Sequence, residues 1–331
     1  MNFSNLKGNF RKPETGRILK WMLGLHDEKQ AKTPATSVPV PFVYNDGKAL
    51  RHATQDALTW IGQASFLIQL GGKSALIDPV LSPSLGWIKR NVPPGLDWPA
   101  LPKIDVVLIT HNHRDHMDAP TLKKLGPDPV YVVPQGLGPW FKKAGMRRII
   151  EMAWWQQLEI EGLKITFVPA EHWSRRGLSD INASWWGGYV LERGGLRAYH
   201  SGDSGWFDGF EMISARCGEI HAAMLPIGAY APRWFMARQH ISPDEAVRAF
   251  LALKASSFVA MHWGTFKLSD EPLDEPPQIL RAAWQRENLP ESQLNIPAIG
   301  ETLLLEHLAT RNSPSIQGEQ LSMFGDGSSG T

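Results

Sequence analysis

The chain has 331 residues, of which 43% are apolar and 20% are charged, and its formal net charge is +1. This balance is typical of a globular protein long enough for one large domain or two ordinary ones. The near-neutral charge gives no sign of a strongly basic face, so we expect no nucleic-acid partner. The single cysteine, Cys217, excludes an intrachain disulfide and a thiolate-rich zinc site, and favours a reducing compartment.

Residues 1–55 are polar and only weakly periodic, and we predict an extension that packs on the main domain. Within it, residues 17–25 ("RILKWMLGL") place apolar side chains at helical spacing. This helix is predicted to pack on the main domain, with a lipid-facing helix as the alternative. The chain has no apolar run near the roughly 18 residues that a membrane span needs, and no recognisable signal peptide. We therefore expect a cytoplasmic protein that could touch a membrane peripherally.

From residue 56 onward, strand-like and helix-like segments alternate without a linker, which predicts one α/β domain over residues 56–308. The tail, residues 309–331, is rich in serine and glycine and is predicted to be disordered. Asp118 and Ser242 are predicted N-caps. Apolar runs predict strands at 57–70, 73–80, 104–110, 129–134, 163–170, 187–193, 196–203, 222–228 and 256–264. Helices are predicted at 118–126, 138–145, 242–253 and 276–288.

Histidine and aspartate side chains lie at or just past the carboxyl ends of four of these predicted strands. Because ligands in α/β sheets bind at the carboxyl ends of strands, these side chains could converge on one place. Imidazole and carboxylate groups suit zinc, and also iron or manganese. The candidate metal ligands are His111, His113, Asp115, His116, His172, Asp203 and His262.

The segment "HNHRDH", residues 111–116, is the densest part of this pattern. Its first two histidines are two residues apart, so in an extended chain they point the same way and could bind one ion. Asp115 and His116 lie past the turn and could reach a second ion, with Asp203 as a bridging carboxylate. The alternative is a polar turn that leads into a helix. Burying so many polar groups at the end of an apolar strand costs free energy unless each group has a partner. This favours a metal site over a polar turn.

The motif "THNHRDH" resembles the H-x-H-x-D-H signature of the metallo-β-lactamase superfamily, and the segments with His172, Asp203 and His262 follow in that superfamily's order. The resemblance covers about residues 56–305. It implies an α/β fold, the αββα sandwich, in which two mixed β-sheets pack face to face between helices. It also implies that His111, His113 and His172 hold one metal, that Asp115, His116 and His262 hold the other, and that Asp203 bridges both.

Longer stretches resemble the N-acyl-phosphatidylethanolamine-hydrolysing phospholipase D family. They are "PAEHW", "SGDSGWF", "PIGAYAPRWFMARQHISPDEAV" and "HWGTF", and the likeness extends through "IDP" and "WIGQAS" to "FRKPETGRILKWML". The resemblance implies two zinc ions, a phospholipid substrate and a homodimer. Gln63 departs from the family, which carries histidine there. Glutamine keeps hydrogen bonding but cannot titrate, which puts a proton-shuttling role in doubt.

Phosphodiester hydrolysis fits this set of residues. Two cations about 3.5–4 Å apart can clamp the attacking and leaving oxygens of an in-line displacement, so a hydroxide between them would attack phosphorus. Asp115 would also orient the hydroxide, and Asp78 would support the metal ligands from behind. His240 would contact a phosphate oxygen or the leaving group, an ordinary loop histidine being the alternative.

The stretch "RWFMARQ", residues 233–239, is the predicted substrate-binding segment. It would form an acyl-chain groove with cations near the phosphate, and the alternative is a buried loop with two surface arginines. The predicted substrate-binding residues are Arg233, Trp234, Phe235, Met236 and Gln239.

Two other functions stay open from the sequence. The protein could hydrolyse a small soluble ester, lactone or phosphodiester instead of a phospholipid, since a fold alone does not fix the substrate. It could also be a metal-stabilised binding protein without activity. The complete ligand set argues against the inert protein, because degenerate members of the superfamily usually lose ligands.

Overall fold

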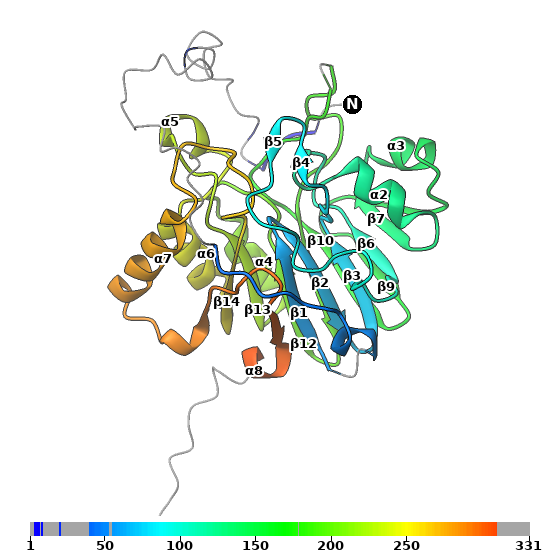
Figure 1. Cartoon of the computed structure of the whole chain (residues 1–331). Helices are drawn as coiled ribbons and strands as arrows, with labels where there is room; N and C mark the ends of the chain where they lie inside the picture. The colour runs from blue at the N-terminus through cyan, green and yellow to red at the C-terminus, as the bar shows by residue number, and fades with distance from the viewer. Residues whose placement is uncertain are drawn as a thin grey trace, which may run out of the picture.

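The computed structural model describes residues 3–6, 8, 20, 40–52, 55–177 and 179–309. Two large β-sheets lie at the centre and helices cover them (Figure 1). In chain order the elements are η1 (Ala49–His52), β1 (Ala57–Gly62), β2 (Ser65–Leu70), β3 (Lys73–Ile77), β4 (Ser84–Leu85), β5 (Ile88–Lys89), β6 (Val106–Leu108), α2 (Ala119–Leu125), β7 (Val130–Pro134), α3 (Gly138–Lys143), β8 (Arg148–Met152), β9 (Gln157–Ile160), β10 (Leu163–Val168), β11 (Gly188–Arg193), β12 (Leu196–His200), α4 (Gly209–Cys217), β13 (Ala222–Pro226), α5 (Arg233–Met236), α6 (Pro243–Leu253), β14 (Ser257–Met261), α7 (Glu275–Arg286), η2 (Glu291–Gln293), β15 (Leu294–Asn295), β16 (Thr302–Leu304) and α8 (Leu305–Ala309).

Each large sheet has seven strands and mixes parallel with antiparallel pairs. The first has the order β16-β1-β2-β3-β6-β7-β8, and its strands run parallel from β3 to β8. The second has the order β15-β14-β13-β12-β11-β10-β9, and its strands run parallel from β12 to β15. The remaining pairs are antiparallel. Strands β4 and β5 form a separate hairpin.

The inner faces of the two sheets share one hydrophobic core. Phe66 of β2 belongs to the same buried cluster as Phe167 of β10 and Phe250 of α6. Leu67, the next residue of β2, instead joins a second cluster with Phe141 of α3. Strands buried on both faces are apolar at nearly every position, which is why "SFLIQL" forms a continuous run. The αββα layering is therefore confirmed, with α2 and α3 on one side and α6 and α7 on the other (Figure 1).

The four predicted helices are confirmed as α2, α3, α6 and α7, and both predicted N-caps are present. Asp118 accepts a hydrogen bond from the backbone N–H of Thr121, at the start of α2. Ser242 and Glu245 form a reciprocal capping box at the start of α6. Asp118 thus serves the helix, and the side-chain hydroxyls of Ser82 and Thr121 also donate to it.

The prediction of a single strand over residues 57–70 is wrong. The segment is an antiparallel hairpin of β1 and β2 that turns between Gly62 and Ser65. Gly62 and Gln63 have φ angles of 115° and 53° there. The turn is buried and lies between apolar segments, so Gly62 and Gln63 do not interrupt the run enough to mark it in the sequence. Strands β8 and β9 are not among the predicted strands. Many of their residues are exposed or half-exposed, so their sequences contain no continuous apolar run.

The N-terminal region is described in parts only. Asn5 is buried, and Phe3 donates a backbone hydrogen bond to Asn182. Residues 40–44 run beside Ile299. Apart from Lys20 and Ala309, the predicted helix at 17–25 and the predicted disordered tail lie outside the described residues, and the domain boundaries stay a prediction. In the described part of the chain, no helix is long and apolar enough to cross a membrane.

Candidate metal centre

The candidate ligands lie in loops that directly follow strands of both sheets. The "HNHRDH" segment follows β6 of the first sheet. His172, Asp203 and His262 follow β10, β12 and β14 of the second sheet. His262 comes one residue after β14, and its backbone N–H donates to the carbonyl oxygen of Gln63, 3.0 Å away, at the end of β1. The site therefore forms only when the two sheets are packed together.

Three histidines form the first cluster of ligand atoms. His113 Nδ1 lies 2.9 Å from His111 Nε2 and 3.2 Å from His172 Nε2. The three atoms lie within 4.8 Å of one another. A single ring proton can satisfy only one of these nitrogen pairs, so lone pairs must face one another here. A cation at the centre would resolve this, because neutral imidazole nitrogens are good ligands for zinc.

Two carboxylates and two histidines form the second cluster. His262 Nε2 lies 3.2 Å from Asp203 Oδ1 and 3.3 Å from Asp115 Oδ2. His116 Nε2 lies 3.1 Å from Asp203 Oδ2. Asp203 Oδ1 is buried, and within the described chain its contact with His262 is close in distance but lacks the geometry of a hydrogen bond. A buried carboxylate oxygen of this kind fits a metal ligand better than a structural acceptor.

Asp203 lies between the two clusters. Its Oδ2 is 4.0 Å from both His111 Nε2 and His172 Nε2, in addition to its contact with His116. The carboxylate thus faces ligand atoms of both groups at once. The five imidazoles and two carboxylates that the sequence singles out are brought together, and their chemistry fits two cations that share one carboxylate.

Electrostatics differ between the two clusters. Burial lowers the pKa of His113 to about 4 and holds the pKa values of His111 and His172 well below the usual 6.5. These three side chains are therefore neutral near pH 7 in the absence of metal. Neutral imidazole is the form that binds a metal ion, so no proton has to be displaced from the first cluster.

In the second cluster, the two carboxylates favour the charged form of the histidines. Burial lowers the pKa of His262, but the carboxylates of Asp203 and Asp115 outweigh burial and bring it to about 9. Burial likewise opposes the charge on His116, and the same two carboxylates hold its pKa well above 6.5. The carboxylates thus create a site that stabilises a cation, and a divalent ion would take the place of the two imidazolium protons.

Hydrogen bonds behind the ligands fix their direction. His116 Nδ1 lies 2.7 Å from Asp78 Oδ2. Asp78 also accepts from the backbone N–H of Thr110, at 2.8 Å, and from its hydroxyl, at 2.6 Å. His172 Nδ1 lies 2.9 Å from the carbonyl oxygen of Gln239, to which it donates. When Nδ1 is engaged in this way, Nε2 keeps its lone pair for the cluster.

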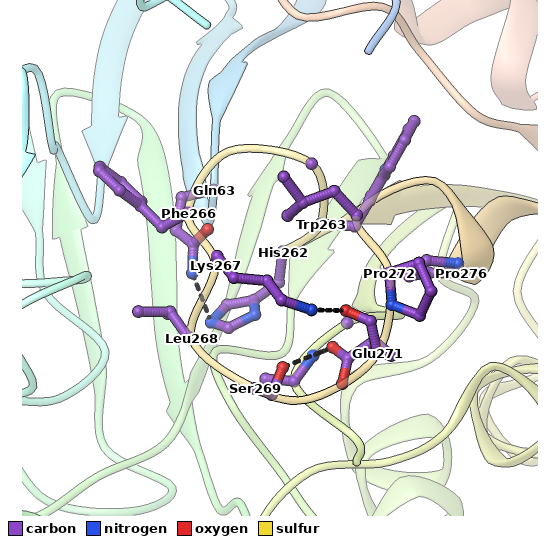
Figure 2. A pocket seen from close by; sticks show the side chains of 14 residues that line it. Gln63, His262, Trp263, Phe266, Lys267, Leu268, Ser269, Glu271, Pro272 and Pro276 are labelled. Carbon is purple, nitrogen blue, oxygen red and sulfur yellow. Dashed lines mark hydrogen bonds between the residues drawn. The ribbon is translucent and has the colours of Figure 1, made fainter. Parts of the chain in front are cut away.

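Gln63 lies beside the second cluster and is 1% exposed. Its Nε2 donates to Asp115 Oδ2 at 3.1 Å and lies 3.0 Å from His262 Nε2. Figure 2 shows this amide directed at the His262 ring, and both side chains line a small cavity together with Lys267 and Glu271. The sequence marked Gln63 only as a departure from the family. In the fold it contacts two candidate ligands.

His240 lies next to the candidate ligands, in the loop after α5. Its Nδ1 is 3.7 Å from Asp203 Oδ2, and its ring lies edge-on to that of His172. Burial lowers the pKa of His240 to about 4. His172, Asp203 and His240 form a third group of converging ligand atoms. The prediction that His240 stands at the reaction centre is thus compatible with its position.

Some of the predicted substrate-binding residues are engaged in hydrogen bonds within the protein and others are half-buried at α5. Their role in substrate binding stays a prediction. Arg233 donates to Glu245 and to the carbonyl oxygen of His240, so its guanidinium fastens this loop to α6. The side chain of Gln239 accepts from the indole of Trp173. The other three residues lie on α5, where Met236 is buried and Trp234 and Phe235 are half-buried and in ring contact.

Two supporting residues were missed by sequence reasoning. Thr110 joins Asp78 to the ligand segment, and its position directly before "HNHRDH" is the signal that could have found it. Asn5 bonds to the backbone of His172 from 167 residues away. No local pattern indicates that contact.

Comparisons with known proteins agree with this fold. The chain matches a family model described as a beta-lactamase superfamily domain over residues 74–263. It is 35% identical to N-acyl-phosphatidylethanolamine-hydrolyzing phospholipase D 1 of Caenorhabditis elegans, over 73% of this chain and 74% of that protein. It is 31% identical to a metal-dependent hydrolase of Methanopyrus kandleri, over 67% of this chain and 88% of that protein. Among solved structures, the metallo-beta-lactamase fold protein YhfI of Bacillus subtilis has a TM-score of 0.53 at 20% identity, covering 75% of this chain and 98% of that one.

Proposed function

Because the chain belongs to the beta-lactamase superfamily and is a metal-dependent hydrolase, we propose that it cleaves phospholipids with two zinc ions. The proposed substrate is N-acyl-phosphatidylethanolamine or a related phospholipid. Cleavage on the headgroup side of the phosphodiester would release phosphatidic acid and the alcohol. The 35% identity to the Caenorhabditis elegans phospholipase D supports this substrate class. Iron or manganese could replace zinc in this set of ligands.

The position of Asp203 is the observation that carries the two-metal proposal. Its carboxylate lies within 4.0 Å of imidazole nitrogens from both clusters. One ion would be held by the first cluster and the second ion by the other, with Asp203 touching both. The ligands are, for the first ion, His111, His113 and His172, and, for the second, Asp115, His116 and His262.

The side chains around the ligands have distinct parts in the proposed reaction. When bound, two zinc ions would lower the pKa of a water molecule and neutralise charge on the phosphodiester. Asp115, held by the Gln63 amide, would orient the attacking water. Asp78 fixes the direction of His116. His240, beside Asp203, would hydrogen-bond a phosphate oxygen or the departing alcohol.

Two features of the surface fit a lipid substrate. Trp234 and Phe235 are half-buried on α5, directly before the loop that carries His240, and could contact acyl chains. Trp87 is 91% exposed in the two-residue turn between β4 and β5. Tryptophan is enriched at membrane–water interfaces, so this hairpin is our candidate for peripheral membrane contact. The homodimer implied by the family resemblance stays a prediction.

The substitution His262→Ala tests the function. It removes one imidazole from the second cluster, and we expect hydrolysis of N-acyl-phosphatidylethanolamine in mixed micelles to fall at least roughly a hundredfold. The folded state should persist, as judged by circular dichroism. His52→Ala, at an exposed position in η1, is the matched control and should keep full activity. Full activity of the His262→Ala variant would refute the assignment of the site.

A second candidate function is hydrolysis of a small soluble ester, lactone or phosphodiester. The 31% identity to the Methanopyrus kandleri protein is equally compatible with it, because that protein is named only as a metal-dependent hydrolase and its name gives no substrate. The two candidates share the metal site and differ in the substrate. Turnover of soluble lactones or esters, with no turnover of phospholipid in micelles or vesicles, would favour the second.

A further inference from the structure

Asn5 belongs to the N-terminal region, yet its side chain is bound to a candidate metal ligand. Its Nδ2 donates to the carbonyl oxygen of His172 at 2.9 Å, and its Oδ1 accepts from the backbone N–H of His172 at 3.1 Å. The indole N–H of Trp186 donates to the same Oδ1 at 2.9 Å. Asn5 is 4% exposed. One amide thus pairs with both backbone groups of His172, much as a neighbouring strand would.

His172 needs such a partner because of where it lies. It follows β10 in an irregular segment that extends to β11, and the whole residue is buried. Buried backbone groups that lack a hydrogen bond are strongly destabilising. In the part of the chain that the structure describes, both backbone groups of His172 are satisfied by Asn5. The backbone of this ligand is therefore positioned by a residue 167 positions away.

The ring of His172 is fixed from the other side. Its Nδ1 donates to the carbonyl oxygen of Gln239, which leaves Nε2 to face His113 Nδ1 at 3.2 Å. Phe3 reinforces the contact of the N-terminal segment, since its backbone N–H donates to Asn182 and its ring lies 4.5 Å from that of Trp185. Backbone and ring of His172 are thus held by separate partners, and the position of Nε2 depends on both.

We propose that Asn5 is a positioning residue of the metal centre, through which the N-terminal segment sets the geometry of His172. The inference rests on the proposed metal ligands. A partner that orients a ligand typically contributes ten- to a hundredfold to metal affinity. Loss of the Asn5 amide should therefore weaken metal binding at the cluster of His111, His113 and His172, and should leave the second cluster less affected.

The test compares Asn5→Ala with Asn45→Ala in the full chain. Asn45 is a matched control because its side chain also makes three hydrogen bonds that pin the N-terminal region, to Gly300, Thr302 and Gly47. These partners are not candidate ligands. Zinc affinity is measured by competition with a chromophoric chelator. We expect a ten- to a hundredfold loss of affinity for one of the two ions in Asn5→Ala, with the other ion less affected, and a change within about twofold for both ions in Asn45→Ala.

Cobalt substitution adds a readout that a general loss of stability would not change. The visible absorption of the Co²⁺-loaded protein should shift in Asn5→Ala and stay unchanged in Asn45→Ala. Should Asn5→Ala not fold, Asn5→Asp is the isosteric variant: it keeps the acceptor for the backbone N–H of His172, turns the donor into a second acceptor against the His172 carbonyl oxygen, and should also shift the spectrum. Unchanged affinity and spectrum in the Asn5 variants, or equal effects of both asparagines, would overturn the inference. A wild-type protein that binds no metal would instead refute the proposed function.

Discussion

At the scale of single residues, the site depends on groups that do not touch the proposed metals. Asp78 is fully buried, and it accepts two hydrogen bonds from Thr110 while facing His116 Nδ1. In Asp78→Asn, one acceptor oxygen becomes a donor, so His116 loses the partner that fixes its ring. We expect zinc affinity of the second cluster to fall roughly tenfold. Chelator competition on the purified variant measures this.

Asp97→Asn is the control for Asp78→Asn. Asp97 also accepts a backbone hydrogen bond, from Ala100 at 3.1 Å, and it is not among the converging ligand groups. Its variant should bind zinc like the wild type. Equal affinity of the Asp78→Asn variant and the wild type would mean that Asp78 serves packing alone.

The sequence predicts individual residues well where chemistry is dense and local. Seven candidate ligands in four segments converge as expected, because each follows the end of a strand. Asn5 and the contacts of Gln63 could not be predicted, since they arise only when distant segments meet. Arg233 has the right charge for a phosphate, but in the fold it binds Glu245 and a backbone carbonyl.

At the scale of elements, the β4–β5 hairpin presents Trp87 at its turn, 91% exposed. If this side chain enters a bilayer interface, Trp87→Ala should lower binding to phosphatidylethanolamine vesicles roughly ten- to a hundredfold, since burial of an aromatic side chain contributes about 1.5–3 kcal/mol. Hydrolysis of a short-chain monomeric substrate should be unaffected. Vesicle flotation with and without the substitution measures the effect.

Leu251→Ala provides the comparison for the hairpin, because Leu251 is an exposed apolar residue of α6, 42% accessible. It should bind vesicles like the wild type. Unchanged flotation of the Trp87→Ala variant would remove the hairpin from the proposed membrane contact.

Elements could be predicted from the sequence where their ends carry chemical signals. Asp118 and Ser242 marked the starts of α2 and α6. The turn at Gly62 and Gln63 carried a weaker signal, because it is buried and its neighbours are apolar, so β1 and β2 were predicted as one strand. This turn matters for function, because it places Gln63 beside His262.

At the scale of the whole molecule, the site joins the two halves of the sandwich. The first sheet supplies the loop after β6, and the second sheet supplies the loops after β10, β12 and β14. Ions bound between the sheets would hold them together. The free energy of unfolding would then rise with the logarithm of the ratio of the free metal concentration to the dissociation constant of the ion. The N-terminal segment, through Asn5, takes part in the same junction.

The metal content of the purified protein tests the central claim most directly. The chain is expressed with zinc in the medium, desalted to remove loosely bound ions, and analysed by inductively coupled plasma mass spectrometry against protein concentration. Two clusters that share Asp203 predict two equivalents of zinc per chain. One equivalent or none, in protein that is folded, would contradict the two-metal centre.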